Sequence, residues 1–279
     1  MSGTEITVAA AALLVAAVIA LVVWVYQTWV VDVVRVSLPS PLEAGVRLVQ
    51  LSDLHGKTRF WNGSISDQVN RLEPDVVLIT GDLTNRLTQR ARVIAELSRI
   101  RCGQIVFIPG NHEWYEYRFL RKMMYPREHY EETMRQLRHA GIVVLENAYT
   151  VIPTPGGRVA VCGFDNSFYG NEKPVHVPAD EQAAYIVALG HAPGIVRFLR
   201  RERIDYDLLL AGHTHGGQIR LLGWSYGIAQ KYHVGLKRLD GGRAFYISRG
   251  LGNVHLPIRL GSRPELTLFE LEGSRNGNG

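Results

Sequence analysis

Five short apolar runs, each followed within a few residues by glycine, aspartate, asparagine or histidine, constrain the fold most. They cover residues 46–51, 76–80, 105–108, 186–189 and 208–211. Continuous Val/Ile/Leu runs of this length are typical of strands buried on both faces of a sheet. Helical patterns lie between them, at residues 66–72, 87–100, 128–140 and 194–202. This alternation predicts a layered α/β domain, with further strands at residues 159–163, 244–248 and 265–271.

The composition supports a globular chain and excludes several other classes. Hydrophobic residues make up 46% and charged residues 20% of the 279 residues, which excludes an intrinsically disordered chain. The two cysteines, Cys102 and Cys162, are too few for a disulfide-rich scaffold, and their spacing matches no zinc ribbon. The net charge of +5 fits an anionic phosphate or lipid surface, and it fits equally a soluble, arginine-rich surface. Because no basic tail or basic repeat is present, no nucleic-acid partner is expected.

The N-terminal segment is too apolar for the surface of a globular domain. No charged residue occurs between Ile6 and Val31, and a helix needs roughly 20 apolar residues to cross a bilayer. Trp24, Tyr26 and Trp29 lie at the end of this segment, where aromatic side chains favour the membrane–water interface. The alternatives are a buried core helix and a cleaved signal peptide, which would have a basic start and a shorter apolar stretch. We expect a retained, single-pass transmembrane helix.

The expected organisation is a transmembrane anchor over residues 1–35, a linker over 36–45, one α/β domain over 46–272 and a disordered tail over 273–279. The linker is predicted from Pro39 and Pro41, and the tail from its polar, glycine-containing composition. The first basic residues, Arg35 and Arg47, follow the anchor. The positive-inside tendency therefore places the domain on the cytoplasmic side of an inner membrane.

Side chains that can bind metals follow all five of the apolar runs. They are Asp53, His55, Asp82, Asn111, His191, His213 and His215. In open α/β sheets, ligand sites form in the crevice outside the carboxyl ends of the strands. One aspartate or histidine at such a place is usually a turn residue, but five such placements together predict a shared site.

The spacing of these residues suits a pair of metal ions. In an extended segment, Asp53 and His55 point to the same side, so that both can bind one cation. His213 and His215 have the same spacing, although a loop can direct them at different ions. Asp82 can bridge two ions through its two oxygens. Mixed nitrogen and oxygen ligands suit Mn, Fe, Zn, Ni or Co better than Ca, and two ions about 3.5–4 Å apart can activate a water and hold a phosphate.

Five ordered motifs contain these residues and span about 170 positions. They are Asp53-Leu54-His55, Gly81-Asp82-Leu83-Thr84-Asn85, Gly110-Asn111-His112-Glu113, Gly190-His191 and Gly212-His213-Thr214-His215. The set resembles the motifs of the calcineurin-like metallophosphoesterases. Residues 212–218, taken with 248–252, resemble the membrane-associated phosphodiesterase branch, which includes bacterial UDP-2,3-diacylglucosamine pyrophosphatases of lipid A synthesis.

The resemblance implies a fold and a role for each motif residue. The fold is a calcineurin-like four-layer α/β sandwich of two mixed β-sheets flanked by helices, here preceded by the transmembrane helix. Asp53, His55 and His215 would hold a first ion, Asn111, His191 and His213 a second ion, and Asp82 would bridge both. His112 would give a proton to the leaving-group oxygen or stabilise the transition-state charge, although it can also be a further ligand.

Residues 114–129 are longer than the corresponding family segment, and residues 114–125 within it mix aromatic, methionine and basic side chains. Such a mixture can lie at a lipid headgroup boundary or line an acyl pocket. The alternative is a helix packed on the domain, with Phe119, Leu120 and Met123 inward. Tyr115 in this segment and Arg249 after a late strand are candidates for substrate contacts, although Arg249 can instead form a surface salt bridge.

The combined prediction is a membrane-anchored phosphoesterase with two divalent metal ions, manganese among the candidates. A metal-bridging hydroxide would attack a phosphodiester or a lipid-linked pyrophosphate, with UDP-2,3-diacylglucosamine as one candidate substrate. The alternative is a phosphodiesterase of broad specificity for soluble nucleotide or glycerophosphodiesters. A nuclease shares the same motifs. A non-catalytic membrane scaffold would have eroded ligands, which this sequence does not show.

Overall fold

The main body consists of two mixed β-sheets. The computed structural model describes residues 2–118, 121–220 and 231–274, and within these ranges each large sheet has six strands. The first has the order β1 (Asp32–Pro39), β16 (Glu265–Glu272), β2 (Val46–Leu51), β5 (Val76–Thr80), β6 (Gln104–Ile108) and β9 (Val143–Val144). The second has the order β10 (Ala148–Thr154), β11 (Gly157–Gly163), β12 (Tyr185–Leu189), β13 (Leu208–Ala211), β15 (Ala244–Ile247) and β14 (Gly235–Arg238). The central strands are parallel, whereas the pairs β16–β2, β10–β11 and β14–β15 are antiparallel.

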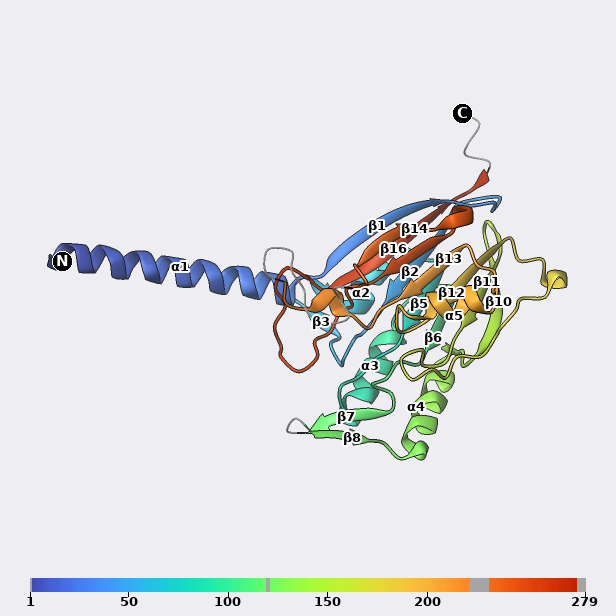
Figure 1. Cartoon of the computed structure of the whole chain (residues 1–279), viewed down its shortest axis with the longest axis horizontal. Helices are drawn as coiled ribbons and strands as arrows, with labels where there is room; N and C mark the ends of the chain where they lie inside the picture. Colours follow the sequence, from blue (N-terminus) through green and yellow to red (C-terminus); the bar gives the residue numbers. More distant parts are fainter. Residues whose placement is uncertain (1, 119–120, 221–230, 275–279) are drawn as a thin grey trace.

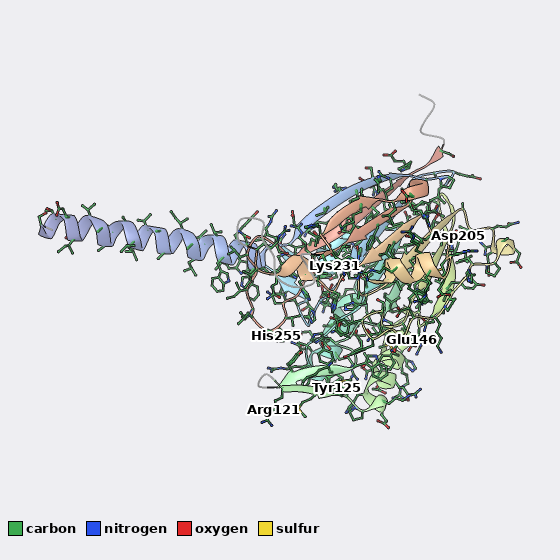
Figure 2. The ribbon with its side chains drawn as sticks, viewed as in Figure 1. Arg121, Tyr125, Glu146, Asp205, Lys231 and His255 are labelled. Carbon is green, nitrogen blue, oxygen red and sulfur yellow. The ribbon has the colours of Figure 1, made fainter. Side chains whose placement is uncertain are left out.

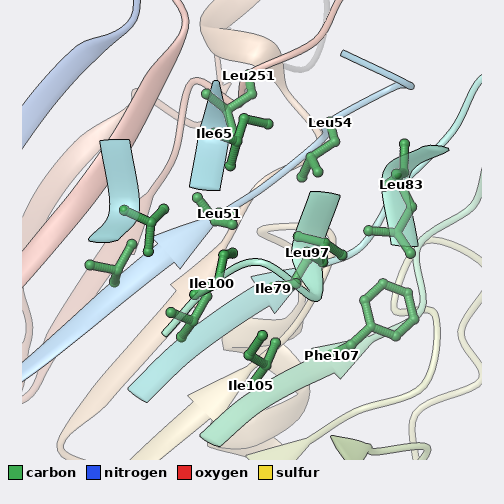
Figure 3. Close-up of a cluster of buried hydrophobic side chains, with 14 of the residues drawn as sticks. Leu51, Leu54, Ile65, Ile79, Leu83, Leu97, Ile100, Ile105, Phe107 and Leu251 are labelled. Carbon is green, nitrogen blue, oxygen red and sulfur yellow. The ribbon is translucent and has the colours of Figure 1, made fainter. Parts of the chain in front are cut away.

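Helices cover the outer faces of both sheets (Figure 1). The first sheet packs against α2 (Ile65–Asn70), α3 (Arg90–Leu97) and α4 (Arg127–His139), and the second against α5 (Ile195–Arg201). One apolar cluster lies between the sheets, and one lies under each outer layer. Figure 3 shows the cluster of the first sheet, where Leu51, Ile79 and Phe107 lie on neighbouring strands below Leu97 of α3. This is the four-layer α/β sandwich expected from the sequence.

The apolar runs form the central strands because their residues can be buried on both faces. All five residues of β5 are buried, and the predicted bounds of β2, β5 and β13 coincide with those in the structure. Helix α4 ends at His139, and Gly141 follows it at a φ of 78°. That left-handed conformation is the one a helix C-terminus favours for glycine.

Helix α1 (Gly3–Trp29) projects from the body (Figure 1). A capping box between Ser2 and Glu5 begins the helix, and the apolar middle of the helix is fully exposed. Its length and composition allow it to cross a membrane. Near its end, Thr28 is completely buried against the body.

The linker predicted over residues 36–45 is wrong in its first part. β1 pairs with β16 in parallel along its whole length, from Asp32 beside Glu265 to Pro39 beside Glu272. Exposed residues of β1 alternate with residues that are half-buried or buried, which is the pattern of an edge strand. A proline is tolerated at the end of such a strand. Of the predicted tail, residues 275–279 lie outside the described residues.

Residues 115–118 and 121–124 form two paired strands instead of the packed helix considered as an alternative. β7 (Tyr115–Arg118) pairs with β8 (Arg121–Met124) in antiparallel register. Met123 and Met124 are exposed, whereas Phe119 and Leu120 lie outside the described residues. A short hairpin of β3 (Arg59–Phe60) and β4 (Gly63–Ser64) lies where α1 meets the body, since Trp61 N donates to Trp29 O at 2.9 Å.

Candidate metal centre

Parallel strands from both sheets bring the predicted ligands to one place. β2, β5 and β6 are neighbours in the first sheet, and β12 and β13 are neighbours in the second. The motif residues directly follow the carboxyl ends of these five strands. The structure places all seven predicted ligand residues together, six of them buried and His213 half-buried.

Asp53, His55 and His215 form the first group. The Nε2 atoms of His55 and His215 are 3.1 Å apart. Asp53 Oδ1 lies 3.5 Å from His215 Nε2 and 4.0 Å from His55 Nε2. Ligands that bind one cation at about 2.0–2.2 Å are separated by comparable distances, so this group can hold an ion.

Asn111, His191 and His213 form the second group. His191 Nε2 lies 3.0 Å from Asn111 Oδ1 and 3.1 Å from His213 Nδ1. The asparagine contributes a neutral oxygen, so this group carries less negative charge than one built from carboxylates. It can hold a second cation.

Asp82 lies between the two groups and faces both with a single oxygen. Its Oδ2 is 3.6 Å from His55 Nε2 and 3.3 Å from His191 Nε2. Its Oδ1 instead accepts a hydrogen bond from His112 N at 2.8 Å. The hydrogen bond from the His112 amide makes Oδ2 the oxygen that faces both groups, and a bridge through both oxygens stays a prediction.

The backbone is strained at the ligands. Five of the seven have φ values in the left-handed region: Asp53 at 50°, His55 at 46°, Asp82 at 57°, His213 at 68° and His215 at 50°. For residues other than glycine, this conformation costs of order 1–3 kcal/mol and persists where the surrounding structure enforces it, often at functional sites. The strain therefore marks these loops as functional.

Hydrogen bonds behind the ligands fix their orientation. His191 Nδ1 donates to Thr80 O at 2.8 Å, so its Nε2 faces the second group. Ser52 Oγ donates to Asp53 Oδ2 at 2.5 Å. Asn111 Nδ2 donates to the hydroxyl of Tyr115 at 2.7 Å, which leaves Oδ1 directed at His191.

Burial keeps most of the imidazoles neutral, as metal ligands require. Burial lowers the pKa of His55 and His215 well below the usual value, and lowers the pKa of His213 to about 3. Burial acts in the same direction on His191, but the charge of Asp82 outweighs it and raises that pKa to about 10. A cation at His191 must therefore displace a proton. Burial also raises the pKa of Asp53 to about 6.

The donor set fits divalent cations. The Nε2 atoms of His55 and His215 face each other. As metal ligands both atoms are unprotonated, and one cation between them could accept the lone pair of each. Nitrogen and oxygen donors without thiolates suit Mn, Fe, Co, Ni or Zn. Asp53, His55 and His215 can hold one ion, and Asp82, His191 and His213 can hold another.

His112 lies at the border of the two groups. Its ring centroid is 4.6 Å from that of His55, and its buried Nδ1 has no hydrogen-bond partner among the described residues. One of its nitrogens lies within 4.8 Å of possible ligand atoms of His55 and Asp82. The geometry therefore permits both a ligand role and a role beside the leaving group.

A cavity of about 230 Å³ lies beside His112. Its lining consists of Asn85, Arg86, Gln89, His112, Tyr117, Val254 and His255. Figure 2 shows His255 on the side of the body from which α1 leaves, between that helix and the paired strands β7 and β8. The cavity can take the part of a substrate that extends beyond the reacting phosphate.

The sequence analysis missed Glu113. Its buried carboxylate accepts hydrogen bonds from the backbone amides of Asp82 at 3.0 Å, Leu83 at 2.8 Å and Gly110 at 2.7 Å. It therefore joins the loops after β5 and β6. Burial and the charge of Asp82 raise its pKa to about 7. The available signal was an acidic residue directly after Asn111 and His112.

Two predicted substrate contacts have other partners in the structure. Arg249 forms ion pairs with Asp32, at 3.0 Å, and with Glu265, which confirms the salt-bridge alternative. Tyr115 is buried and bonds to Asn111. Direct contact of either residue with a substrate stays a prediction.

Gly212 lets the second sheet approach Asp53. A Cβ at this position would lie 1.9 Å from Ser52 Oγ and 2.4 Å from Asp53 Oδ2. We expect Gly212→Ala to destabilise the protein by about 1–3 kcal/mol and to reduce bound metal, measured by thermal unfolding and elemental analysis. Gly194→Ala is the control, because nothing lies within 4 Å of its Cβ position. Equal effects of the two substitutions would contradict this packing argument.

Comparison with known proteins gives consistent matches. A profile of the calcineurin-like phosphoesterase family matches residues 46–217. The chain is 32% identical to phosphodiesterase YaeI of Escherichia coli over 240 residues, covering 82% of this chain and 83% of YaeI. It is 27% identical to the uncharacterized metallophosphoesterase YkoQ of Bacillus subtilis over 252 residues, covering 83% and 85%. It is 29% identical to a transmembrane protein with metallophosphoesterase domain of Danio rerio over 254 residues, covering 84% of this chain and 55% of that protein, so it spans about half of the fish protein.

Proposed function

This chain belongs to the calcineurin-like phosphoesterase family, and from that premise we propose that it is a membrane-anchored hydrolase that uses two divalent cations to cleave a phosphodiester or pyrophosphate bond. Membership of this family makes the chain a metal-dependent phosphoester hydrolase. Our proposal adds that it binds a second cation, that it is anchored in a membrane and that it acts on the substrates given below. The observation that carries it is the pair of ligand groups that share Asp82 Oδ2.

The residues of the chain divide the chemistry between them. When bound, divalent cations lower the pKa of a water and neutralise charge on phosphoryl oxygens. Asp82 lies between the two ligand groups and sets their spacing. Buried hydrogen bonds orient Asp53 in the first group and His191 in the second. His112 gives a hydrogen bond or a proton to the leaving-group oxygen. Burial lowers the pKa of this ring.

We propose that α1 holds this site at a membrane surface. The helix is long and apolar enough to cross a bilayer, and a relative from Danio rerio is named a transmembrane protein. Trp61 and Leu256, near the junction of α1 with the body, are exposed large apolar side chains. Arg35 and Arg47 favour the cytoplasmic side of an inner membrane.

A lipid-linked substrate follows from this placement. A site held at the membrane meets lipid phosphates at high local concentration, so a lipid-linked pyrophosphate such as UDP-2,3-diacylglucosamine is the proposed substrate class. The polar cavity beside His112, with Arg86 and His255 in its wall, suits a hydrophilic leaving portion. The second candidate, a soluble nucleotide or glycerophosphodiester, is favoured by the relative YaeI, which is named a phosphodiesterase.

The test is a substrate panel with the full chain in detergent or nanodiscs. We expect manganese-dependent cleavage of an aryl phosphodiester that chelation abolishes, and release of UMP from UDP-2,3-diacylglucosamine at a higher kcat/KM than from soluble diesters. Cleavage of soluble diesters alone would overturn the lipid substrate and leave the hydrolase intact. Preferential cleavage of DNA or RNA would indicate a nuclease. A chain that binds no metal and cleaves nothing would be the scaffold.

A further inference from the structure

Arg259 is a completely buried arginine whose side chain bonds to neutral groups. Nε and Nη2 both donate to Gly252 O, at 2.9 and 2.5 Å. Nη1 donates to Arg249 O at 2.9 Å and to Ser262 O at 3.0 Å. Burial lowers the pKa of this guanidinium to about 10. Burying a cation against neutral partners is costly, so a residue kept in this position calls for a reason beyond packing.

The guanidinium also reaches the first ligand group. Nη2 of Arg259 lies 3.2 Å from Nδ1 of His215, on the opposite side of the ring from the Nε2 that faces Asp53 and His55. Ser262 Oγ donates to the carbonyl oxygen of His215 at 2.7 Å. Ser262 therefore holds the backbone of His215. The guanidinium of Arg259 lies beside the ring without a hydrogen bond to it, because Nδ1 carries the ring proton when Nε2 binds a cation and two donors then face each other.

The three carbonyl groups that Arg259 binds belong to one loop, residues 249–262, and this loop packs on the first ligand group. Gly252 N donates to Asp53 O at 2.6 Å, and Leu251 N donates to Ser52 O at 3.0 Å. A Cβ on Gly252 would lie 2.6 Å from His55 Cβ. Arg259 thus fixes the shape of a loop that touches all three residues of the group.

The backbone of Arg259 is bound to the foot of α1. Thr28 Oγ1 accepts a hydrogen bond from Arg259 N at 3.1 Å and lies 3.3 Å from Arg259 O. Thr28 is the one buried residue of a helix whose other described residues are at least partly exposed. Lys57 Nζ donates to the carbonyl oxygen of Thr28 at 2.8 Å. A continuous chain of contacts therefore runs from the end of α1 through Arg259 to His215.

We infer that Arg259 is a positioning residue of the first ligand group and that the seating of α1 at Thr28 holds it in place, so that the membrane helix is a structural part of the metal centre. This inference rests on the proposed role of His215 as a metal ligand. Arg259 acts through the loop that it holds, because its N–H donors cannot bond to the protonated Nδ1 of a ligating His215. Groups behind metal ligands typically contribute about 10–100-fold to metal affinity. Two side chains that never touch the cation should therefore control its binding.

The test measures metal affinity of the full chain in detergent, using manganese and zinc with elemental analysis. We expect Arg259→Gln to weaken binding at one of the two sites by about 10–100-fold and to speed hydrogen exchange at residues 249–262. Arg259→Lys keeps the positive charge but lacks the planar set of N–H donors, so we expect it to recover little of the metal affinity that Arg259→Gln loses. Thr28→Val removes the hydroxyl at nearly constant volume and should weaken the same site by a smaller factor, about 3–10-fold, while the protein still folds.

Two matched variants separate positioning from general damage. Thr7→Val removes a hydroxyl from the exposed part of the same helix, where it bonds only within the helix. Arg263→Gln removes a guanidinium that bonds to Tyr26 of α1 and to Asp32, away from His215. Both should bind two cations as the unmodified chain does, even where thermal stability falls.

The outcomes are distinguishable. Unchanged metal affinity and exchange in both Arg259→Gln and Thr28→Val would overturn the inference, and so would equal losses in Arg263→Gln. If His215→Ala itself keeps both metals, the proposed function is wrong and the inference falls with it. If His215→Ala loses metal while the Arg259 and Thr28 variants do not, the inference alone is wrong.

Discussion

Asp82→Asn is expected to lose both cations and to lower kcat/KM for an aryl phosphodiester by about a thousand-fold or more, equivalent to about 4 kcal/mol of transition-state stabilisation. The reason is that Oδ2 of Asp82 is the oxygen common to both ligand groups. The amide of asparagine has the same shape but lacks the charge, so neither group keeps its affinity. Elemental analysis and steady-state kinetics check this result.

Glu131→Gln is the matched control for Asp82→Asn. Glu131 is an exposed carboxylate on α4 that pairs with Arg127, so its neutralisation should leave metal content and kcat/KM unchanged. Two cations per chain and normal turnover in the Asp82 variant would refute the shared-oxygen arrangement and, with it, the proposed function.

His112→Gln is expected to keep both cations and to lower kcat by about 10²–10⁴-fold, the usual contribution of a positioned acid or base. Glutamine keeps the backbone amide that binds Asp82 Oδ1 but cannot supply an imidazole proton. The decrease in kcat should be smaller for substrates whose leaving group departs without a proton, such as those that release p-nitrophenol. Kinetics with good and poor leaving groups, together with metal analysis, measure both effects.

His139→Gln, an exposed substitution on α4, serves as the histidine control and should change neither quantity. Loss of one cation from the His112 variant would instead make His112 a ligand, which its distance to His55 and Asp82 permits. Retention of full activity with poor leaving groups would exclude it from the reaction.

Much of the fold and of the candidate site could be predicted because the signals are local. β5 and β13 are almost wholly apolar, β2 is apolar except for Arg47 and Gln50, and their ligands follow at once in the sequence. Parallel strands of one sheet place their carboxyl ends at one edge, so Asp53, Asp82 and Asn111 converge without any knowledge of the loops. The apolar helix is equally local, since its composition alone defines it.

The rest depends on partners that are distant in sequence. β1 became an edge strand because it pairs with β16, more than two hundred residues away. Only the tertiary structure shows that the amide of His112 occupies one oxygen of Asp82. Arg259 gave no signal, because a single arginine in a loop is usually at the surface and its partners here are carbonyl groups.

The way α1 leaves the body has a mechanical consequence. Val31 N donates to Asn62 Oδ1, Asn62 Nδ2 donates to Val31 O, and Trp61 N donates to Trp29 O. A catalytic domain joined to its membrane helix by a flexible linker can take many orientations and many heights above the bilayer. At this junction the hydrogen bonds join the end of α1 to the body, so in the proposed membrane-anchored arrangement the orientation of the body and the height of the catalytic pocket above the bilayer would follow the tilt of α1.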